Sequence, residues 1–231
     1  MSRRRVMGLL AGAASAVLAG CGLLGSNSYR FRMTVEAETP QGPKRGTAVY
    51  AVKAQNHTQL LPDMRGRSRD VRGEAVAVDL PGGRTFFALL KTMNQAGDDD
   101  LAYMSMATLD PAYKNDWVES ARRISSGEGI RSPAEVAVDD YPLLVTFRDI
   151  ADPASVEQVD PADLASSFGP GVRLKRITVE ITDDPVTTGI EKRLGWLSDY
   201  YAKRLDGQRF GDGTSLANDL SAGAFSTESH Q

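Results

Sequence analysis

The sequence predicts an α+β fold, with one antiparallel sheet built from hairpins and two or three helices on one side of it. Three observations lead to this fold class. Apolar and polar residues alternate with a period of two in the first half of the chain, and Gly- and Pro-rich turns separate the alternating runs. Apolar residues at helical spacing gather in the second half. With 41% hydrophobic and 25% charged residues, the composition excludes a polytopic membrane protein and a wholly disordered chain.

The first hairpin has the clearest pattern. Over residues 29–38, Tyr, Phe, Met, Val and Ala alternate with Arg, Thr and Glu, which predicts a strand with one buried face. Residues 40–46 contain two prolines and two glycines and should form a turn or loop. A second strand is expected over residues 47–55, paired with the first.

A second hairpin is expected after a polar loop at residues 56–72. Two apolar runs, at residues 74–80 and 85–91, flank the sequence Pro81-Gly82-Gly83-Arg84. The glycines allow the positive φ that a tight connection needs. Four consecutive antiparallel strands are therefore predicted for the N-terminal half.

Helices and strands should mix in the second half. Asp110-Pro111 resembles an N-cap followed by a proline in the first helical position, so we expect a helix from there to about residue 125. A strand should follow at residues 143–148. Asp160-Pro161 repeats the capping signal and should open a short helix that ends at Phe168-Gly169.

The last long strand, residues 172–182, has a defect in its alternation. Its first two apolar residues, Val172 and Leu174, share one parity, whereas its last three share the other. Either a bulge at Lys175-Arg176 shifts the phase, or the strand is buried on both faces.

A final helix is expected over residues 188–205, because four apolar residues there are spaced to form one stripe. They are Ile190, Leu194, Leu197 and Tyr201. From Asp206 the chain is rich in Gly, Ser, Asp and Asn and lacks apolar periodicity, so residues 206–231 are expected to form a flexible tail. The folded part would then be a single α+β domain over residues 29–205.

The N-terminus has the features of an export signal. Arg3, Arg4 and Arg5 precede an apolar run of about 13 residues that ends at Leu18. As a helix this run would span about 20 Å, which is too short for a bilayer core of about 30 Å and suits a signal peptide. The stretch of residues 2–7 also loosely resembles a twin-arginine export signal.

The apolar run ends in Leu18-Ala19-Gly20-Cys21, which resembles the lipobox of bacterial lipoproteins. The resemblance implies that the Cys21 thiol receives a diacylglycerol, that a peptidase cuts before Cys21, and that the new amine is acylated. Residues 1–20 would then be a signal peptide, and residues 21–28 the lipidated cysteine and a flexible tether. The alternative is an ordinary secreted protein in which Cys21, the single cysteine of the sequence, is incidental.

Two further resemblances concern location and family. Lipoproteins kept in the inner membrane often have a Cys-Asp pattern, and Gly22 stands in its place here. An outer-membrane anchor facing the periplasm is therefore expected, with the periplasmic face of the inner membrane as the alternative. The stretch from Val145-Thr146-Phe147-Arg148-Asp149 to Glu191-Lys192-Arg193-Leu194 is also similar to an uncharacterised family of proteobacterial lipoproteins, which implies no activity.

Few residues suit catalysis or metal binding. The acid clusters Asp98-Asp99-Asp100, Asp139-Asp140 and Asp183-Asp184 lack the spacing of a calcium loop, and turn or cap roles explain them. His57 lies in a polar loop and His230 near the C-terminus, and the sequence has no nucleophile elbow, P-loop or zinc motif. We therefore expect no catalytic residue, cofactor or metal. The formal net charge of −3 also argues against a nucleic-acid partner.

Two groups of side chains are candidates for binding. The first is a basic loop made by Arg65, Arg67, Arg69 and Arg72. Its guanidinium groups could hold lipid headgroups, lipopolysaccharide or peptidoglycan carboxylates, and a solvated loop is the alternative. The second is Trp196 with Tyr200, which could form a partner surface or belong to the edge of the core.

These observations predict a lipid-anchored periplasmic protein with a noncatalytic binding or envelope-assembly role. It would contact the membrane through the lipid on Cys21, and its partner would be an envelope protein or an anionic envelope ligand. Two other functions stay open: an envelope hydrolase that uses its acidic residues, and a lipoprotein that excludes phage or toxins.

Overall fold

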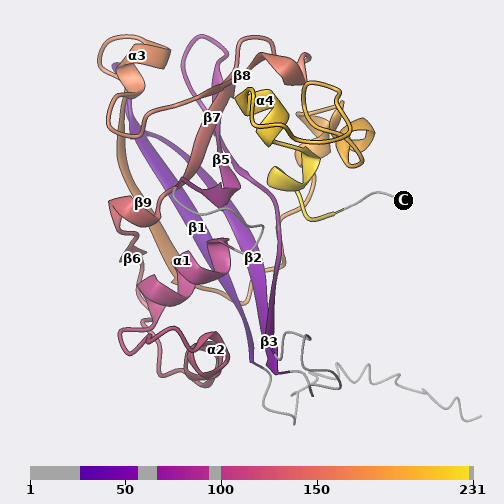
Figure 1. Ribbon diagram of the computed structural model, residues 1–231. Helices are drawn as coiled ribbons and strands as arrows, with labels where there is room; N and C mark the ends of the chain where they lie inside the picture. Colours follow the sequence, from indigo (N-terminus) through magenta and orange to yellow (C-terminus); the bar gives the residue numbers. More distant parts are fainter. Residues whose placement is uncertain (1–26, 57–66, 94–99, 229–231) are drawn as a thin grey trace, which may run out of the picture.

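The computed structural model describes residues 27–56, 67–93 and 100–228. They form two antiparallel sheets and several short helices, which confirms the α+β fold class (Figure 1). The first sheet has the order β3 (Arg67–Arg72), β2 (Lys44–Asn56), β1 (Ser28–Glu38), β9 (Arg173–Ile181) and β6 (Ala134–Glu135). The second has the order β4 (Val76–Asp79), β5 (Thr85–Thr92), β7 (Pro142–Phe147) and β8 (Val156–Gln158).

Both predicted hairpins are confirmed, but they do not share a sheet. The β1–β2 hairpin belongs to the first sheet and the β4–β5 hairpin to the second. The predicted polar loop between them is partly wrong, because residues 67–72 form the edge strand β3. The two sheets meet where Gly46 of β2 passes β4, and a Cβ atom at Gly46 would lie 2.1 Å from the carbonyl oxygen of Ala77. Only glycine fits this approach.

Strand β1 has one buried face, as the alternation of its residues predicted. Its odd-numbered residues from Tyr29 to Ala37 are buried, whereas the even-numbered ones are half-buried. We call the face that carries the even-numbered residues of β1 the outer face of the first sheet. On the other face pack α1 (Asp100–Leu109) and α2 (Trp117–Ser126), the latter through Ala121 and Ile124.

The defect in β9 is a bulge, as one of the two interpretations predicted. Glu36 pairs with Arg176, but the next residue of β1, Ala37, pairs with Leu174, so Lys175 is the extra residue. The bulge restores the phase, since Ile177 and Val179 are fully buried and Leu174 also packs on the core.

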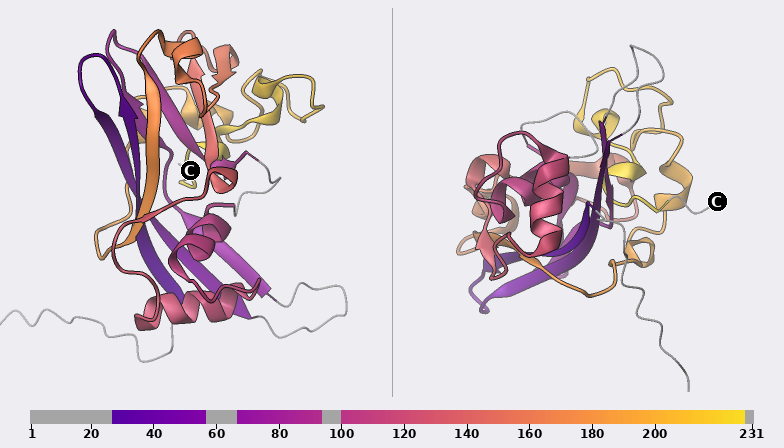
Figure 2. Two further views of the ribbon diagram at one scale, coloured as in Figure 1. Left: turned by 90° about the vertical axis from the view of Figure 1, so that its left-hand side faces the viewer. Right: turned by 90° about the horizontal axis from the view of Figure 1, so that it is seen from below.

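The second sheet lies between two hydrophobic cores. Phe86 and Ala88 of β5 face the first sheet, whereas Phe87 and Leu89 face a second cluster formed with the C-terminal segment. Burial on both faces explains why β5 is an almost continuous apolar run. Figure 2 shows the resulting layers, with the first sheet on one side and the C-terminal segment on the other.

The helix expected from Asp110 to about residue 125 is present as α2, but its predicted start is wrong, and so is the exact start of the next helix. Asp110 follows α1, and its Oδ1 accepts a hydrogen bond from Ala112 N (3.1 Å), which makes a turn. Asp116 caps α2 instead, by accepting from Glu119 N. Asp160 makes the same kind of turn, and Asp163 caps α3 (Leu164–Phe168). An Asp side chain satisfies a turn as readily as a helix N-terminus, so Asp-Pro did not distinguish them.

The expected final helix over residues 188–205 is also wrong. The chain forms two 3₁₀ turns, η3 (Ile190–Lys192) and η4 (Leu197–Tyr200). Leu194, Trp196 and Leu197 are all at most 8% exposed. In an α-helix Trp196 would lie about 200° around the axis from Leu194, so one buried stripe could not hold both. Burial of the large indole decides the backbone here.

The predicted flexible tail is corrected as well, because residues 206–228 are folded. They contain α4 (Leu216–Asp219) and η5 (Ala222–Ala224), and Leu220 and Phe225 are almost fully buried. Backbone hydrogen bonds join this segment to the start of β4, among them Ala75 N to Phe225 O at 2.8 Å. The folded domain therefore reaches at least to Glu228 rather than ending at residue 205.

Buried Glu74 fastens the C-terminal segment to the sheets. The side chain is 2% exposed, and its Oε2 accepts a hydrogen bond from Ile190 N at 2.9 Å. Burial raises the pKa of the Glu74 carboxyl, and the backbone N–H groups of Ile190 and Gly189 only partly offset this.

Candidate functional site

A depression of about 710 Å³ opens where β1 begins. Figure 1 shows this start of β1 at the lower end of the molecule. Its lining comes from β1, β2 and β3, from the C-terminal end of α2 and from the segment that follows β9. The lining includes Tyr29, which faces the core, and Arg30, which faces the outer side. Because successive residues of a strand point to opposite faces, the depression extends around the start of β1 from one face of the sheet to the other.

Cross-strand pairing places basic side chains around one small residue. Ala51 of β2 pairs with Arg30 of β1 and with Arg72 of β3. Residues directly opposite one another share a face, so the two arginines flank Ala51 on the outer face. Lys53, two residues further along β2, projects from the same face. Three cations therefore surround the methyl group of Ala51, and one acid, Asp70 of β3, lies on the same face directly opposite Lys53.

The segment after β9 crosses the outer face and borders the depression. Arg32 of β1 donates to Thr182 Oγ1 (3.3 Å) and forms an ion pair with Asp184. Further along, Thr187 N donates to Val49 O (3.1 Å), and Val49 N donates to Thr187 Oγ1 (2.9 Å). The segment is thus tied to β1 and then to β2, and its start forms one wall of the depression.

The described lining carries more positive than negative charge. Its basic residues are Arg30, Lys53, Arg72 and Arg131, and its acidic residues are Asp70 and Asp183. Within the part of the chain that the structure describes, none of the four basic side chains forms an ion pair. By contrast, Arg32, Arg173 and Arg176 on the same outer face all pair with acidic residues. Among the described residues, positive charge without an ion-pair partner therefore collects at the start of β1.

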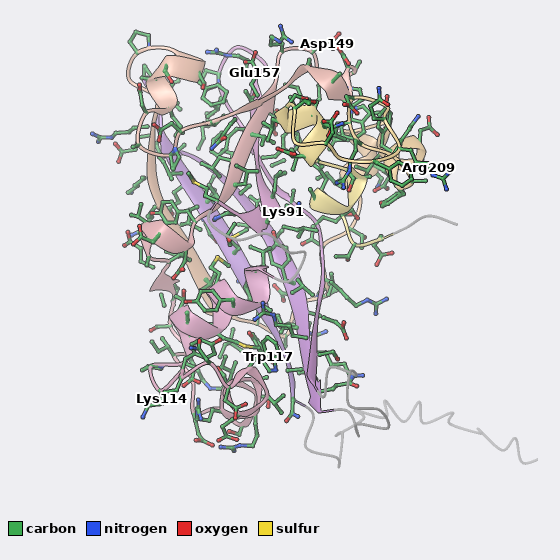
Figure 3. All side chains as sticks on the ribbon, viewed as in Figure 1. Lys91, Lys114, Trp117, Asp149, Glu157 and Arg209 are labelled. Atoms are coloured by element: carbon green, nitrogen blue, oxygen red, sulfur yellow. The ribbon has the colours of Figure 1, made fainter. Side chains whose placement is uncertain are left out.

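The structure places the side chains of two of the four arginines of the predicted basic loop, Arg69 and Arg72. Arg65 lies outside the described residues, as does the side chain of Arg67. Arg69 lies over Trp117 of α2, with its Cζ 4.4 Å from the ring centroid, at the lower end of the molecule (Figure 3). Arg72 lines the depression. Alternation along β3 sends Arg69 and Arg72 to opposite faces, so they do not form one binding loop.

The predicted partner surface at Trp196 and Tyr200 belongs to the second core, as the alternative interpretation proposed. Trp196 is 8% exposed, and its Nε1 donates to Ile150 O at 2.9 Å. Its ring packs against Phe147, Phe225 and Tyr200. Tyr200 is half-buried beneath Lys203. Trp196 is therefore not available to a partner in this conformation.

Among the described residues, the other candidates from the sequence do not come together; Asp98 and Asp99 lie outside these residues. Cys21, His57 and His230 lie outside the described residues. Asp139-Asp140 lies in η1 (Val138–Asp140), where burial and the charge of Asp139 raise the pKa of Asp140. Asp183-Asp184 lies in the segment that crosses the outer face. Among the described residues, no group of three or more His, Cys, Asp or Glu is placed to hold a metal ion.

Sequence reasoning missed Arg30 and Lys53. Both lie at outward positions of strands that the alternation predicted. The hairpin register pairs Arg30 with Ala51 and Lys53 with Ser28. The register could be read only after the turn length was known, and the pairing of β3 was not expected at all.

No family model, curated protein or solved structure matches the chain. The similarity to a proteobacterial lipoprotein family therefore stays a prediction. None of the helices over the described ranges has the length and apolar character needed to cross a bilayer.

Proposed function

We propose that this chain is a lipoprotein of the bacterial envelope, held by lipid on Cys21, with a noncatalytic binding or assembly role for its folded body. The observation that carries the proposal is Leu18-Ala19-Gly20-Cys21 at the end of a short apolar run. Strand β1 begins at Ser28, seven residues beyond Cys21. Seven residues span at most about 25 Å, so the anchor would keep the start of β1 close to the membrane.

The lipid, rather than the protein surface, would supply the attachment. Removal of residues 1–20, which hold three arginines and no acid, takes the formal net charge from −3 to −6. An acidic body is repelled by an anionic membrane as a whole. Several acyl chains on one cysteine give a stable anchor, whereas a single chain binds reversibly. The proposed site is the outer membrane, and the inner membrane is the alternative.

A binding role for the body is supported by the depression at the start of β1. It offers cations that have no ion-pair partner among the described residues, in a concave setting, which suits an anionic envelope ligand.

Mass spectrometry of the protein purified from its native membrane tests the anchor. We expect an N-terminus at Cys21 that carries three acyl chains, and we expect Cys21→Ala to release the protein from the membrane fraction. Gly22→Asp is the matched control, because it should keep the acylation and move the protein to the inner membrane. A different N-terminus, or a free thiol on Cys21 in membrane-bound protein, would overturn the anchor.

Affinity purification of the acylated protein from membranes tests the binding role. A partner or ligand that is recovered with the wild type and lost with Arg30→Gln would support it. Turnover of an envelope substrate by the folded body would refute a noncatalytic role and favour the hydrolase.

A further inference from the structure

We infer that the depression at the start of β1 is a binding site for a phosphate group, held by Arg30, Arg72 and Lys53 above Ala51. The phosphate can belong to a lipid headgroup or to a soluble phosphorylated ligand. The lipid source rests on the proposed anchoring at Cys21, whereas the site itself rests only on described residues.

The geometry of the three strands supplies the cradle. Arg30 and Arg72 stand on either side of Ala51, each about 5 Å away at the Cβ atom. Both side chains are several bonds long, so their guanidinium groups can meet above the methyl group of Ala51. A larger side chain at residue 51 would fill that space. Lys53 lies diagonally from both arginines on the same face and closes a third side, next to Asp70 of β3, which is its direct cross-strand partner.

The number of donors favours phosphate over a carboxylate. One arginine fork already satisfies both oxygens of a carboxylate. Two arginines and a lysine that approach from three strands match a group with three or four oxygens and up to two negative charges. Arg131 also lines the depression, but it lies beside Gly127 at the end of α2, on the other face of the sheet, and is therefore not part of the cradle.

Other arginines on the outer face differ from Arg30, because they pair with acidic residues of the same sheet. Arg173 donates from Nε to Glu38 Oε2 at 2.8 Å, and Arg176 donates to Glu36 Oε2 at the same distance. The sheet therefore neutralises arginines along β9 with acids from β1. On β2 Arg30 has Ala51 rather than an acid opposite it, whereas Lys53 has Asp70 of β3 opposite it. An anion from outside the chain would take the place of the acid that Arg30 lacks on β2.

The position of the depression makes a membrane phosphate accessible. Ser28, where β1 begins, is itself part of the lining. With a lipid on Cys21, the depression lies within about 25 Å of the anchor, which is the reach of seven residues. The body as a whole is acidic, so this basic end would turn toward an anionic surface and orient the protein.

The test uses the full chain purified from membranes and placed on vesicles of phosphatidylcholine alone or mixed equally with phosphatidylglycerol. Hydrogen–deuterium exchange is measured for amides of β1, β2 and β3 near the depression, with and without inorganic phosphate. If the phosphate belongs to a soluble ligand, we expect exchange to be slower with inorganic phosphate than without it. If it belongs to a headgroup, we expect exchange to be slower on the mixed vesicles than on phosphatidylcholine alone. Either result supports the phosphate site.

Variants separate the cradle from general charge. Arg30→Gln and Arg72→Gln should each raise the half-saturating phosphate concentration about tenfold or more. Ala51→Glu places a carboxylate in the cradle and should abolish the effect. The matched control is Arg45→Gln. It removes one exposed arginine of β2, the strand that carries Ala51, and should change phosphate binding less than about twofold.

Two results would overturn the inference: no slowing of exchange in any arm, or an equal loss of binding in Arg45→Gln and Arg30→Gln. Unchanged exchange in β5 and β7 verifies that each variant is folded. The mass of the same sample reports acylation separately, so an absent lipid would refute the anchor without touching the inorganic phosphate arm.

Discussion

Asp110 and Arg123 form an ion pair that is largely withdrawn from water. The side chains are 3% and 18% exposed, and Arg123 Nη2 lies 2.5 Å from Asp110 Oδ2. Burial alone would raise the pKa of Asp110, but the hydrogen bonds from Arg123 and neighbouring donors outweigh it and lower the pKa below its usual value. The stability that Asp110 contributes is therefore present above that usual value and is lost as the pH falls through the lowered pKa.

Asp110→Asn should lower the free energy of unfolding by about 2 kcal/mol, because it leaves Arg123 with an uncompensated charge. The neighbouring Arg122 pairs with Glu119 and Glu128 at the surface. Arg122→Gln should have no measurable effect, since exposed ion pairs contribute little. Urea denaturation at neutral pH compares the two variants, and equal effects would contradict the distinction.

Glu74 should give the protein a pH dependence of the opposite sign. Because its pKa is raised, its contribution to stability is complete below its ordinary pKa of 4.5 and is lost as the pH rises through the raised value. Glu74→Gln cannot ionise, and its amide oxygen can still accept from Ile190 N. We expect thermal melts of Glu74→Gln to lack the loss of stability that the wild type shows above about pH 4.5.

The control for this experiment is Glu157→Gln, which changes an exposed carboxylate on β8 that pairs with Arg148. It should keep the pH dependence of the wild type. If Glu74→Gln and the wild type show the same dependence, Glu74 is not responsible for it.

The bulge in β9 gives a prediction at the level of the element. Deletion of Lys175 would bring Leu174 next to Arg176 and leave a regular strand with the same inward residues. The fold should survive, at a cost of about 1–2 kcal/mol. Deletion of Thr178 would instead move every residue on one side of it to the other face, and should abolish folding. Circular dichroism and thermal melts of both variants check this, and equal tolerance would contradict it.

Elements with a local period could be predicted from the sequence, and elements shaped by distant contacts could not. The hairpins and the phase shift in β9 follow from alternation alone. The segment after Gly189 follows from the burial of Trp196 against Phe147 and Phe225, which lie far away in the sequence. Arg72 could be selected as a candidate by its charge, but Arg30 required the register of three strands.

At the scale of the whole molecule, the C-terminal segment completes the second core. A chain that ends at Leu205 would lack Leu220 and Phe225 and would expose Phe87 and Leu89 of β5. Each buried side chain contributes about 1.5–3 kcal/mol, and a domain of this size has about 5–15 kcal/mol in all.

We therefore expect the chain truncated after Leu205 to show no cooperative thermal transition and to aggregate. A chain truncated after Glu228 is the control, and it should melt like the full chain. A cooperative melt of the shorter chain would mean that residues 206–228 are dispensable, as the sequence had suggested.

The same segment has a consequence for the order of events during synthesis. Phe225 and Ala222, which close the second core, follow every strand of the two described sheets in the sequence. A nascent chain therefore cannot cover the far side of β5 until residues 222–225 have been made. Until then this core stays open to chaperones or a translocation channel, although the strands of both sheets are already present.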